Sequence, residues 1–273
     1  MAILNVTPDS FSDGGRLTTA ESAIQAGLAA ARHGAALVDI GGESTRPRGK
    51  TYGAGAGEVA AEEEIRRVVP VVAGLRAANL SLPISVDTRK AEVAEAALSA
   101  GADLINVVTG LSPEPRLLEF VASSGAAIIL NHCRGTPATT FEVSKFGNVV
   151  QEVAQDLAEA FRLAVEAGIA EDRILLDPGL GFGKSVEENV ALLLGLARLA
   201  PAGVPLVVGA SRKAFLTTAV PRCPGRTIAP DERLPESLAA AALAARGGGR
   251  NPILLRVHDT DETVRFLGVL ALA

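Results

Sequence analysis

The stretch GAALVDIGG, residues 34–42, shows the unit from which the chain is built. A Gly-Ala pair precedes an apolar run, and the run ends in polar and glycine residues. The same order recurs at 101–110 (GADLINVVTG) and 125–135 (GAAIILNHCRG), and in longer form at 167–183. Glycine commonly follows the end of a helix, and a continuous apolar run is typical of a strand buried on both faces of a parallel sheet. Each unit therefore predicts a helix end followed by a buried parallel strand.

Beyond these units, the whole chain alternates between two kinds of segment. Apolar runs predict strands near residues 2–5, 36–40, 83–87, 103–106, 126–131, 173–177, 205–209 and 252–257. Segments rich in Ala, Glu and Leu predict helices at 20–32, 58–78, 90–100, 149–166 and 187–199. Eight βα units indicate an α/β protein with a (β/α)8 TIM barrel. The alternative, a Rossmann-like open sheet, lacks a G-x-G-x-x-G after its first strand. No linker divides the chain, so we expect a single barrel domain over residues 1–273.

Composition narrows the class of protein. The chain has 273 residues, 48% of them hydrophobic, and a net charge of −5 without a block of basic residues. This balance argues against nucleic acid or a membrane surface as a partner. Two cysteines exclude a disulfide scaffold and fit the cytoplasm. No signal peptide is evident, and the apolar runs are shorter than the ~20 residues that span a bilayer. We therefore expect a soluble cytoplasmic protein.

The first loop, NVTPDSFSDGG at residues 5–15, follows the first predicted strand directly. In TIM barrels the active site lies in the loops at the carboxyl ends of the strands, so this loop belongs to the site. Its proline and glycines are explained by turn formation. Turn formation does not explain why Asn5, Asp9, Phe11 and Asp13 occur together, and these residues are candidates for binding.

Nearly every predicted strand ends in groups that can bind or react. These residues are Asn5, Asp39, Asp87, Asn106, Asn131, His132, Asp177, Ser211 to Lys213, Arg256 and His258. Side chains two residues apart share one face of a strand, so Arg256 and His258 point the same way, as do Ser85 and Asp87. We expect the inward faces to converge at the mouth of the barrel.

Four of these residues suit a flat heterocycle with several N–H groups. Asp87 and Asp177 are carboxylates that accept two parallel hydrogen bonds, and Asn106 both accepts and donates. Lys213 could donate to a carbonyl group of the ring. The sequence thus predicts a pocket for a ring ligand at the barrel mouth.

A second group of residues suits phosphate. Arg46, Arg256 and His258 are cationic or hydrogen-bonding groups of the kind that hold phosphates. The segment SRKAFLT, residues 211–217, resembles the start of the short extra helix that often binds phosphate in barrels. The glycine-rich run at 177–184 lacks the G-x-x-x-x-G-K-[ST] spacing of a P-loop, so its lysine need not touch phosphate.

Six motifs occur together in one order: NVTPDSFSDGG, GGESTRP, SVDTRK, DPGLGFGK, SRK and RVHD. In this set and order the chain resembles the dihydropteroate synthases over almost its whole length. The resemblance implies an enzyme of folate biosynthesis with a transferase activity. Such an enzyme joins 6-hydroxymethyl-7,8-dihydropterin pyrophosphate to p-aminobenzoate, releases pyrophosphate and uses Mg2+. The resemblance also implies a homodimer, and the apolar segment 238–245 permits one.

The resemblance assigns roles to individual residues. It places the pterin pocket at Asp87, Asn106, Asp177 and Lys213. It places pyrophosphate binding at Asn5, Thr45, Arg46, Arg256 and His258, and the magnesium contact at Asn5. It places the p-aminobenzoate pocket and its mobile loops at Phe11, Asp13, Pro47 and Phe182. The residues expected to act in catalysis are Asn5, Lys213, Arg256 and His258.

The chain departs from the family pattern at several positions. Val107 stands where relatives usually have Asp, although alternation turns it away from Asn106. Ala214 stands where a serine often helps to bind the aminobenzoate carboxylate, so backbone N–H groups would have to suffice. Asn131 and Cys133 replace a methionine-rich stretch and should alter the pterin pocket. Relatives also usually carry a short leader, so either the barrel floor is less covered here or the start lies upstream.

Other residues have simpler interpretations. His33 lies at a predicted helix end, where a cation suits the helix dipole. Cys133 fits a small core residue. Asp39 could be a core-facing residue with a local partner, whereas for His132 a structural and a site role stay equally open. The histidines are not at metal-ligand spacing.

Two other functions stay open from the sequence. One is the pterin-binding barrel of a methyltetrahydrofolate-dependent methyltransferase, and the other is a non-catalytic pterin-binding barrel. The SRK, RVH and GGESTRP motifs favour the synthase, because the methyltransferase does not need groups that bind pyrophosphate.

Overall fold

The computed structural model describes residues 1–7, 19–43, 59–135, 145–218 and 228–272. Eight parallel strands follow one another in chain order in one sheet. They are β1 (Ala2–Asn5), β2 (Val38–Gly41), β3 (Ile84–Asp87), β4 (Leu104–Val107), β5 (Ala127–Asn131), β6 (Ile174–Asp177), β7 (Leu206–Val208) and β8 (Ile253–Leu255). Every strand predicted from the sequence is confirmed, with ends that agree within two residues.

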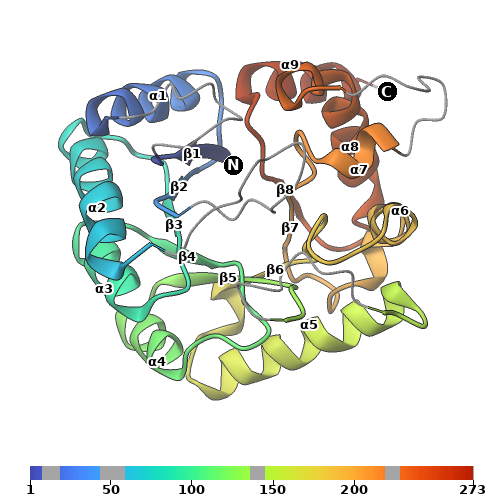
Figure 1. Cartoon of the computed structure of the whole chain (residues 1–273), viewed down its shortest axis with the longest axis horizontal. Helices are drawn as coiled ribbons and strands as arrows, with labels where there is room; N and C mark the ends of the chain where they lie inside the picture. The colour runs from blue at the N-terminus through green and yellow to red at the C-terminus, as the bar shows by residue number, and fades with distance from the viewer. Residues whose placement is uncertain (8–18, 44–58, 136–144, 219–227, 273) are drawn as a thin grey trace.

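The sheet closes on itself. A parallel bridge joins Ala2 to Val257, just past β8. The Ile3 amide donates to the Val257 carbonyl at 3.0 Å, and the Val257 amide donates to the Met1 carbonyl at 3.0 Å. The prediction of a (β/α)8 barrel is therefore confirmed, and the open Rossmann-like sheet is wrong. Figure 1 shows the helices in a ring around the strands.

The main helices are α1 (Ala20–Arg32), α2 (Ala61–Ala77), α3 (Ala91–Ser99), α4 (Pro115–Ser124), α5 (Val149–Glu166), α6 (Val186–Leu194), α7 (Ala214–Thr218), α8 (Leu234–Gly247) and α9 (Thr260–Leu270). The helix predicted over 187–199 is divided, because it stops at Gly195 and resumes as a short 3-10 turn at 196–198. A side chain at Gly195 would lie 3.2 Å from the methyl groups of Val150 on α5, so glycine permits this close packing. No helix in the described part of the chain is both long and apolar enough to cross a membrane.

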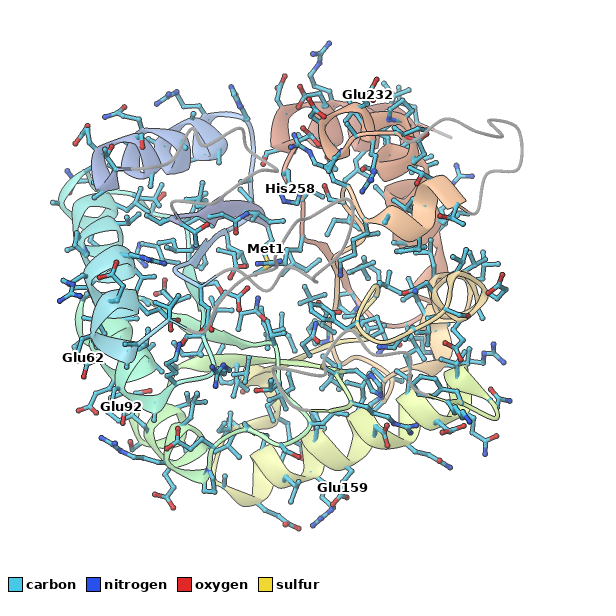
Figure 2. The ribbon with its side chains drawn as sticks, viewed as in Figure 1. Met1, Glu62, Glu92, Glu159, Glu232 and His258 are labelled. Carbon is cyan, nitrogen blue, oxygen red and sulfur yellow. The ribbon has the colours of Figure 1, made fainter. Side chains whose placement is uncertain are left out.

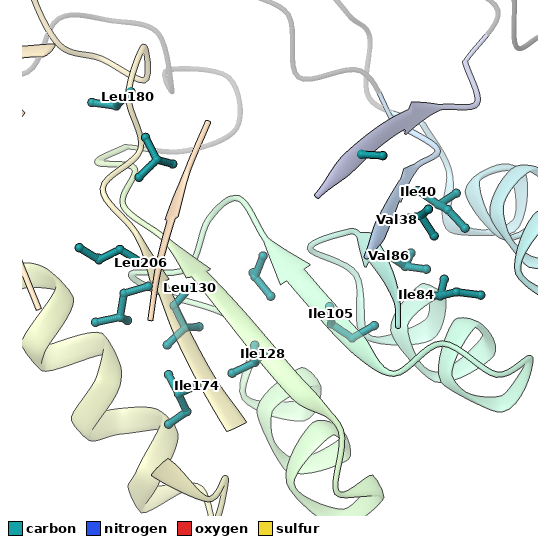
Figure 3. Packing of buried hydrophobic residues seen from close by; sticks show 14 of the residues in the cluster. Val38, Ile40, Ile84, Val86, Ile105, Ile128, Leu130, Ile174, Leu180 and Leu206 are labelled. Carbon is teal, nitrogen blue, oxygen red and sulfur yellow. The ribbon is translucent and has the colours of Figure 1, made fainter. Parts of the chain in front are cut away.

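Alternation along the strands separates two environments. Outward residues such as Ile84, Val86 and Ile105 pack between the sheet and the helices in the main core (Figure 3). A smaller cluster, Met1, Leu37, Leu104, Ile129 and Val207, is separate from it. Because side chains alternate, the strand residues of this cluster face the barrel interior. The residues two positions further along β4 and β5 are Asn106 and Asn131, so the same inward face turns polar at the mouth.

Candidate active site

Strand register brings the predicted site residues to one level. Asn5 is in register with Gly41, Gly41 with Asp87, and Asp87 with Asn106. Further round the barrel Asn131 is in register with Asp177. Lys213, Arg256 and His258 follow the ends of β7 and β8, and His258 lies inside the ring of helices (Figure 2). The convergence predicted from the strand ends is therefore present.

Arg256 lies across the barrel interior between two carboxylates. Its Nε donates to Asp39 Oδ2 at 2.7 Å, and its Nη2 donates to Asp87 Oδ2 at 2.9 Å. Asn106 Nδ2 also donates to Asp39 Oδ2, at 3.4 Å. Asp39 faces the core as expected, but its partner is not local, because Arg256 is 217 residues away in sequence. Here the guanidinium predicted to bind phosphate neutralises buried acid groups.

The pKa values of the charged groups at the mouth are shifted mainly by burial. Burial raises the pKa of Asp87 to about 7, the nearby Arg256 opposes the rise, and Asp39 adds to it. Burial also raises the pKa of Asp177, against the effect of Lys213 and of the Gly179 amide. Burial lowers the pKa of Lys213 to about 8, with Asp177 opposing. Both signs of charge at the mouth therefore titrate near neutral pH.

The loop after β6 is fixed by hydrogen bonds to its own backbone. Asp177 Oδ1 accepts from the Gly179 amide at 2.7 Å. The buried Lys184 ammonium donates to three carbonyls, those of Gly179 at 2.9 Å, Phe182 at 3.1 Å and His132 at 3.3 Å. Gly179 has a φ of +65°, and a Cβ there would lie 1.9 Å from the His132 carbonyl oxygen. Lys184 thus organises a loop, a role that was not predicted from the sequence.

Asn189 also holds this loop, and sequence reasoning missed it. Its Oδ1 accepts from the Gly181 amide at 2.6 Å, and its Nδ2 donates to the carbonyls of Lys184 at 3.1 Å and Ser185 at 2.7 Å. Asn189 lies on the buried face of α6. An amide among the leucines of a helix was the signal available in the sequence, since a buried amide needs partners.

Lys213 joins this loop to the end of β7. Its ammonium donates to the Leu180 carbonyl and lies 4.5 Å from the centroid of the Phe182 ring, a cation–π contact. The two residues predicted for the ring pocket and for the aminobenzoate pocket are therefore in direct contact.

The SRK and RVHD motifs lock together. Ser211 Oγ lies 3.1 Å from His258 Nδ1 and accepts from the His258 amide at 3.2 Å. Arg212, at a φ of +60°, pairs through Nε with Asp259 Oδ2 at 3.0 Å. Arg212 was one of the strand-end candidates in the sequence, but neither Arg212 nor Asp259 was given a role there. Their pairing orients the segment that carries Lys213 on one side and His258 on the other.

The start of the second loop is held by charge. Lys90 pairs with Glu43 and with the fully buried Glu64, and Arg67 Nη1 donates to the Gly42 carbonyl at 2.9 Å. The further loop residues predicted for the site lie outside the residues that the structure describes: Asp9, Phe11, Asp13, Thr45, Arg46 and Pro47.

The structure decides several positions that the sequence left open. His132 is fully buried and its Nε2 lies 3.0 Å from Asp156 Oδ2 on α5, so it serves the packing of β5 against that helix. Burial lowers the pKa of His132 to about 4, so the ring is neutral at pH 7. Val107 is buried in the main core, away from Asn106, as alternation predicted. Cys133 is buried, consistent with a small core residue.

No group of three His, Cys, Asp or Glu residues in the described ranges is arranged to hold a metal ion. Mg2+ uses oxygen ligands, keeps several waters and is commonly bound through a few protein oxygens together with substrate phosphates. The amide oxygen of Asn5 at the end of β1 can serve as one such oxygen. Asn5 thus fits a magnesium ion that is held largely by the phosphates of a substrate. The described residues do not form a closed protein site for the ion.

The barrel and its mouth belong to a known class of enzyme. The sequence model for the family described as pterin binding enzyme matches residues 1–258. The chain therefore belongs to the pterin-binding enzymes.

The relatives define the class more narrowly. The dihydropteroate synthase of Escherichia coli is 42% identical over 270 residues, which cover 99% of this chain and 89% of that protein. The Mycobacterium leprae enzyme is 41% identical, with 99% and 91% covered. The solved Xanthomonas albilineans dihydropteroate synthase with 4-aminobenzoic acid is 46% identical, has a TM-score of 0.85 and covers all of this chain and 91% of that one. Within its family the chain stands among the dihydropteroate synthases, and the resemblance found in the motifs is confirmed.

Proposed function

We propose that this enzyme condenses 6-hydroxymethyl-7,8-dihydropterin pyrophosphate with p-aminobenzoate, giving 7,8-dihydropteroate and pyrophosphate in folate biosynthesis. The observation that carries the proposal is the convergence of Asp87, Asn106, Asp177, Lys213 and Arg256 at one barrel mouth. The relatives support it, since the Xanthomonas albilineans enzyme has been solved with 7,8-dihydropteroate as well as with 4-aminobenzoic acid.

The pterin ring is bound mainly by buried hydrogen-bond acceptors at the barrel mouth. Asp177 accepts two parallel N–H bonds from the pterin, Asp87 and Asn106 bind a further edge, and Lys213 donates to the ring carbonyl. Burial strengthens each of these interactions, because water does not compete for the same groups. Asn131, in register with Asp177, lines the same pocket.

The chemistry needs no protein nucleophile. As pyrophosphate departs, positive charge on the exocyclic methylene spreads into the electron-rich dihydropterin, and the arylamine nitrogen then attacks that carbon. Arg256 and His258 hold the departing oxygens, together with Thr45 and Arg46 of the second loop. Ser211, 3.1 Å from His258 Nδ1, fixes the orientation of the imidazole ring.

Asn5 would contribute an oxygen to Mg2+ brought with the pyrophosphate. When bound, the ion supplies positive charge to the leaving group. Titration of pyrophosphate by calorimetry with and without Mg2+ tests this assignment. The Asn5→Ala variant should lose the magnesium-dependent part of the affinity and keep the remainder.

The arylamine pocket is assigned to Phe182, with Phe11, Asp13 and Pro47 supplied by the two long loops. Lys213 beneath the Phe182 ring fixes the orientation of that wall. Ala214 begins α7 and offers no hydroxyl group, so backbone N–H groups there bind the aminobenzoate carboxylate.

We further propose a cytoplasmic homodimer that binds only small molecules. Helices α8 and α9 expose Leu243 by 48% and Val269 by 69%, which suits an apolar contact between copies. The mass in solution, measured by light scattering, tests this proposal. Leu243→Glu should shift a dimer toward monomer.

The deciding experiment is pyrophosphate release by the purified chain, supplied with the dihydropterin pyrophosphate and Mg2+, with and without p-aminobenzoate. Release that depends on p-aminobenzoate and yields dihydropteroate supports the synthase. Pterin binding without release would favour a methyltransferase-like or non-catalytic pterin barrel instead.

A further inference from the structure

Asp39 is a charged residue in a position where barrels usually place an apolar one. It lies within β2, two residues before Gly41, so it faces the interior one layer below the mouth. Its exposed fraction is 0%. A buried carboxylate is strongly unfavourable unless it is paired and hydrogen-bonded, so the pairing explains how the fold tolerates Asp39.

The pairing is specific. Asp39 Oδ2 accepts from Arg256 Nε at 2.7 Å and lies 2.6 Å from Nη2, while Asn106 Nδ2 donates to the same oxygen. Asp39 Oδ1 has no hydrogen-bond partner among the described residues. Asp39 therefore binds chiefly to Arg256, whose guanidinium is proposed to hold the departing pyrophosphate.

Asp87 shares the Nη2 end of the same guanidinium with Asp39, because Nη2 lies 2.9 Å from Asp87 Oδ2 and 2.6 Å from Asp39 Oδ2. Asp87 is also the acceptor assigned to the pterin ring. A ring bound to Asp87 must therefore compete with Arg256 Nη2, whereas nothing in the proposed ring pocket competes for Nε. Asp39 lies a layer deeper, beyond the ring.

We propose that Asp39 is a positioning residue, which anchors Arg256 through Nε and one N–H of Nη2 so that the other N–H of Nη2 passes from Asp87 to the substrate phosphate when the ring binds. The inference rests on the proposed function. It predicts that the two parts of the substrate assist each other, because a ring on Asp87 releases Nη2 for phosphate and phosphate on Nη2 releases Asp87 for the ring. Such coupling is reciprocal by thermodynamic necessity.

The first measurement is calorimetry on the wild-type chain with 6-hydroxymethylpterin and pyrophosphate, each alone and in the presence of the other, with Mg2+ throughout. We expect the pterin to tighten pyrophosphate binding about fivefold or more, within the usual range for coupled sites. Equal affinities with and without the pterin would overturn the proposed exchange.

The second measurement uses Asp39→Asn, which keeps the shape and removes the charge. Pyrophosphate affinity should fall about tenfold, as expected for loss of a charge-assisted contact, and the coupling to pterin should disappear. In the Arg256→Met background the same Asp39→Asn change should have no further effect on pyrophosphate, because Asp39 acts only through Arg256.

Asp103→Asn is the matched control. It makes the same chemical change in a carboxylate that pairs with Arg76 just before β4, at the opposite end of the barrel. It should leave pyrophosphate affinity unchanged. An Asp39→Asn effect that persists without Arg256, or that the Asp103 variant shares, would identify a purely structural role. A wild-type chain that binds no pyrophosphate would instead refute the proposed function itself.

Discussion

The two sides of the barrel mouth are held in different ways. On the β6 side, Lys184 and Asn189 direct their hydrogen bonds to backbone groups, so the loop that carries Phe182 has its shape fixed from within. On the β2–β3 side, Asp39 and Asp87 share the side chain of Arg256. Bonds to the backbone cannot be exchanged for ligand without unfolding the loop, whereas a bond between side chains can. The β6 side is therefore a rigid wall of the site, fixed by bonds to the backbone. The β2–β3 side is held by an ion pair between side chains that a ligand can replace.

The largest loss of affinity should come from a substitution at Asp177, the first residue of the rigid β6 side. Asp177→Ala removes two ring hydrogen bonds and the acceptor of the Gly179 amide. At about 1.5–3 kcal/mol for each bond to a charged group, affinity for 6-hydroxymethylpterin should fall about 100-fold or more by calorimetry. Asp172→Ala, at an exposed residue just before β6, is the control. Unchanged pterin affinity in Asp177→Ala would contradict the assignment.

Removing the exchangeable side should separate the two halves of the substrate. Arg256→Ala should lower pyrophosphate affinity about 30-fold, the loss expected for charge-assisted bonds. Free pterin should still bind, because Asp87 no longer has an internal competitor. The two affinities are measured separately by titration. A parallel loss of both would indicate a folding defect.

A smaller effect, on KM, should follow when the β6 loop is made less rigid but the residues that bind the pterin ring are kept. Lys184→Met keeps the length of the side chain and removes its three hydrogen bonds to carbonyls. The Phe182 segment should loosen, and KM for p-aminobenzoate should rise about fivefold, a loss of about 1 kcal/mol. KM for the pterin substrate should change little. The opposite pattern in steady-state kinetics would show that Lys184 serves the ring pocket.

The affinity for pterin should also depend on pH, and this dependence separates the two sides of the mouth by the sign of their titrating groups. Asp87 is protonated below a pKa of about 7, so the affinity for pterin should rise as pH increases through that value. Lys213 loses its proton above about pH 8, so affinity should fall beyond it. Each limb can reach at most about tenfold per pH unit.

These limbs can be assigned by substitution. Binding of 6-hydroxymethylpterin, followed from pH 5.5 to 9.5, should lose its acidic limb in Asp87→Asn and its alkaline limb in Lys213→Met. An unchanged acidic limb in Asp87→Asn would show that another group titrates.

The sequence predicts much of this architecture because the signals are local. A Gly-Ala pair ahead of an apolar run marks a helix end and a strand, and polar residues directly after the run mark the mouth. Asn5, Asp87, Asn106 and Asp177 all emerged in this way. Caps also act locally, since Ser185 and Glu188 form a capping box that sets the start of α6.

What the sequence could not predict depends on contacts between distant segments. The sequence near Asp39 does not predict that its partner is Arg256, because only closure of the barrel brings β8 near β2. The pairing of Arg212 with Asp259 is of the same kind. The direction of His132 was equally hidden, since a residue just past a strand can turn either inward or, as here, toward α5. Local patterns fixed the level of each residue in the barrel, and tertiary contacts decided its partner.

Gly179 has a consequence for anyone who wishes to change the arylamine that such an enzyme accepts. Even the smallest side chain there would place a carbon 1.9 Å from the His132 carbonyl oxygen, at a backbone angle that disfavours any residue but glycine. A library that randomises the β6 loop should therefore spare this position. Phe182 and Ala214 are better positions to vary. Substitution there can widen the pocket or add a hydroxyl group while the carbonyl groups bound by Lys184 keep their places.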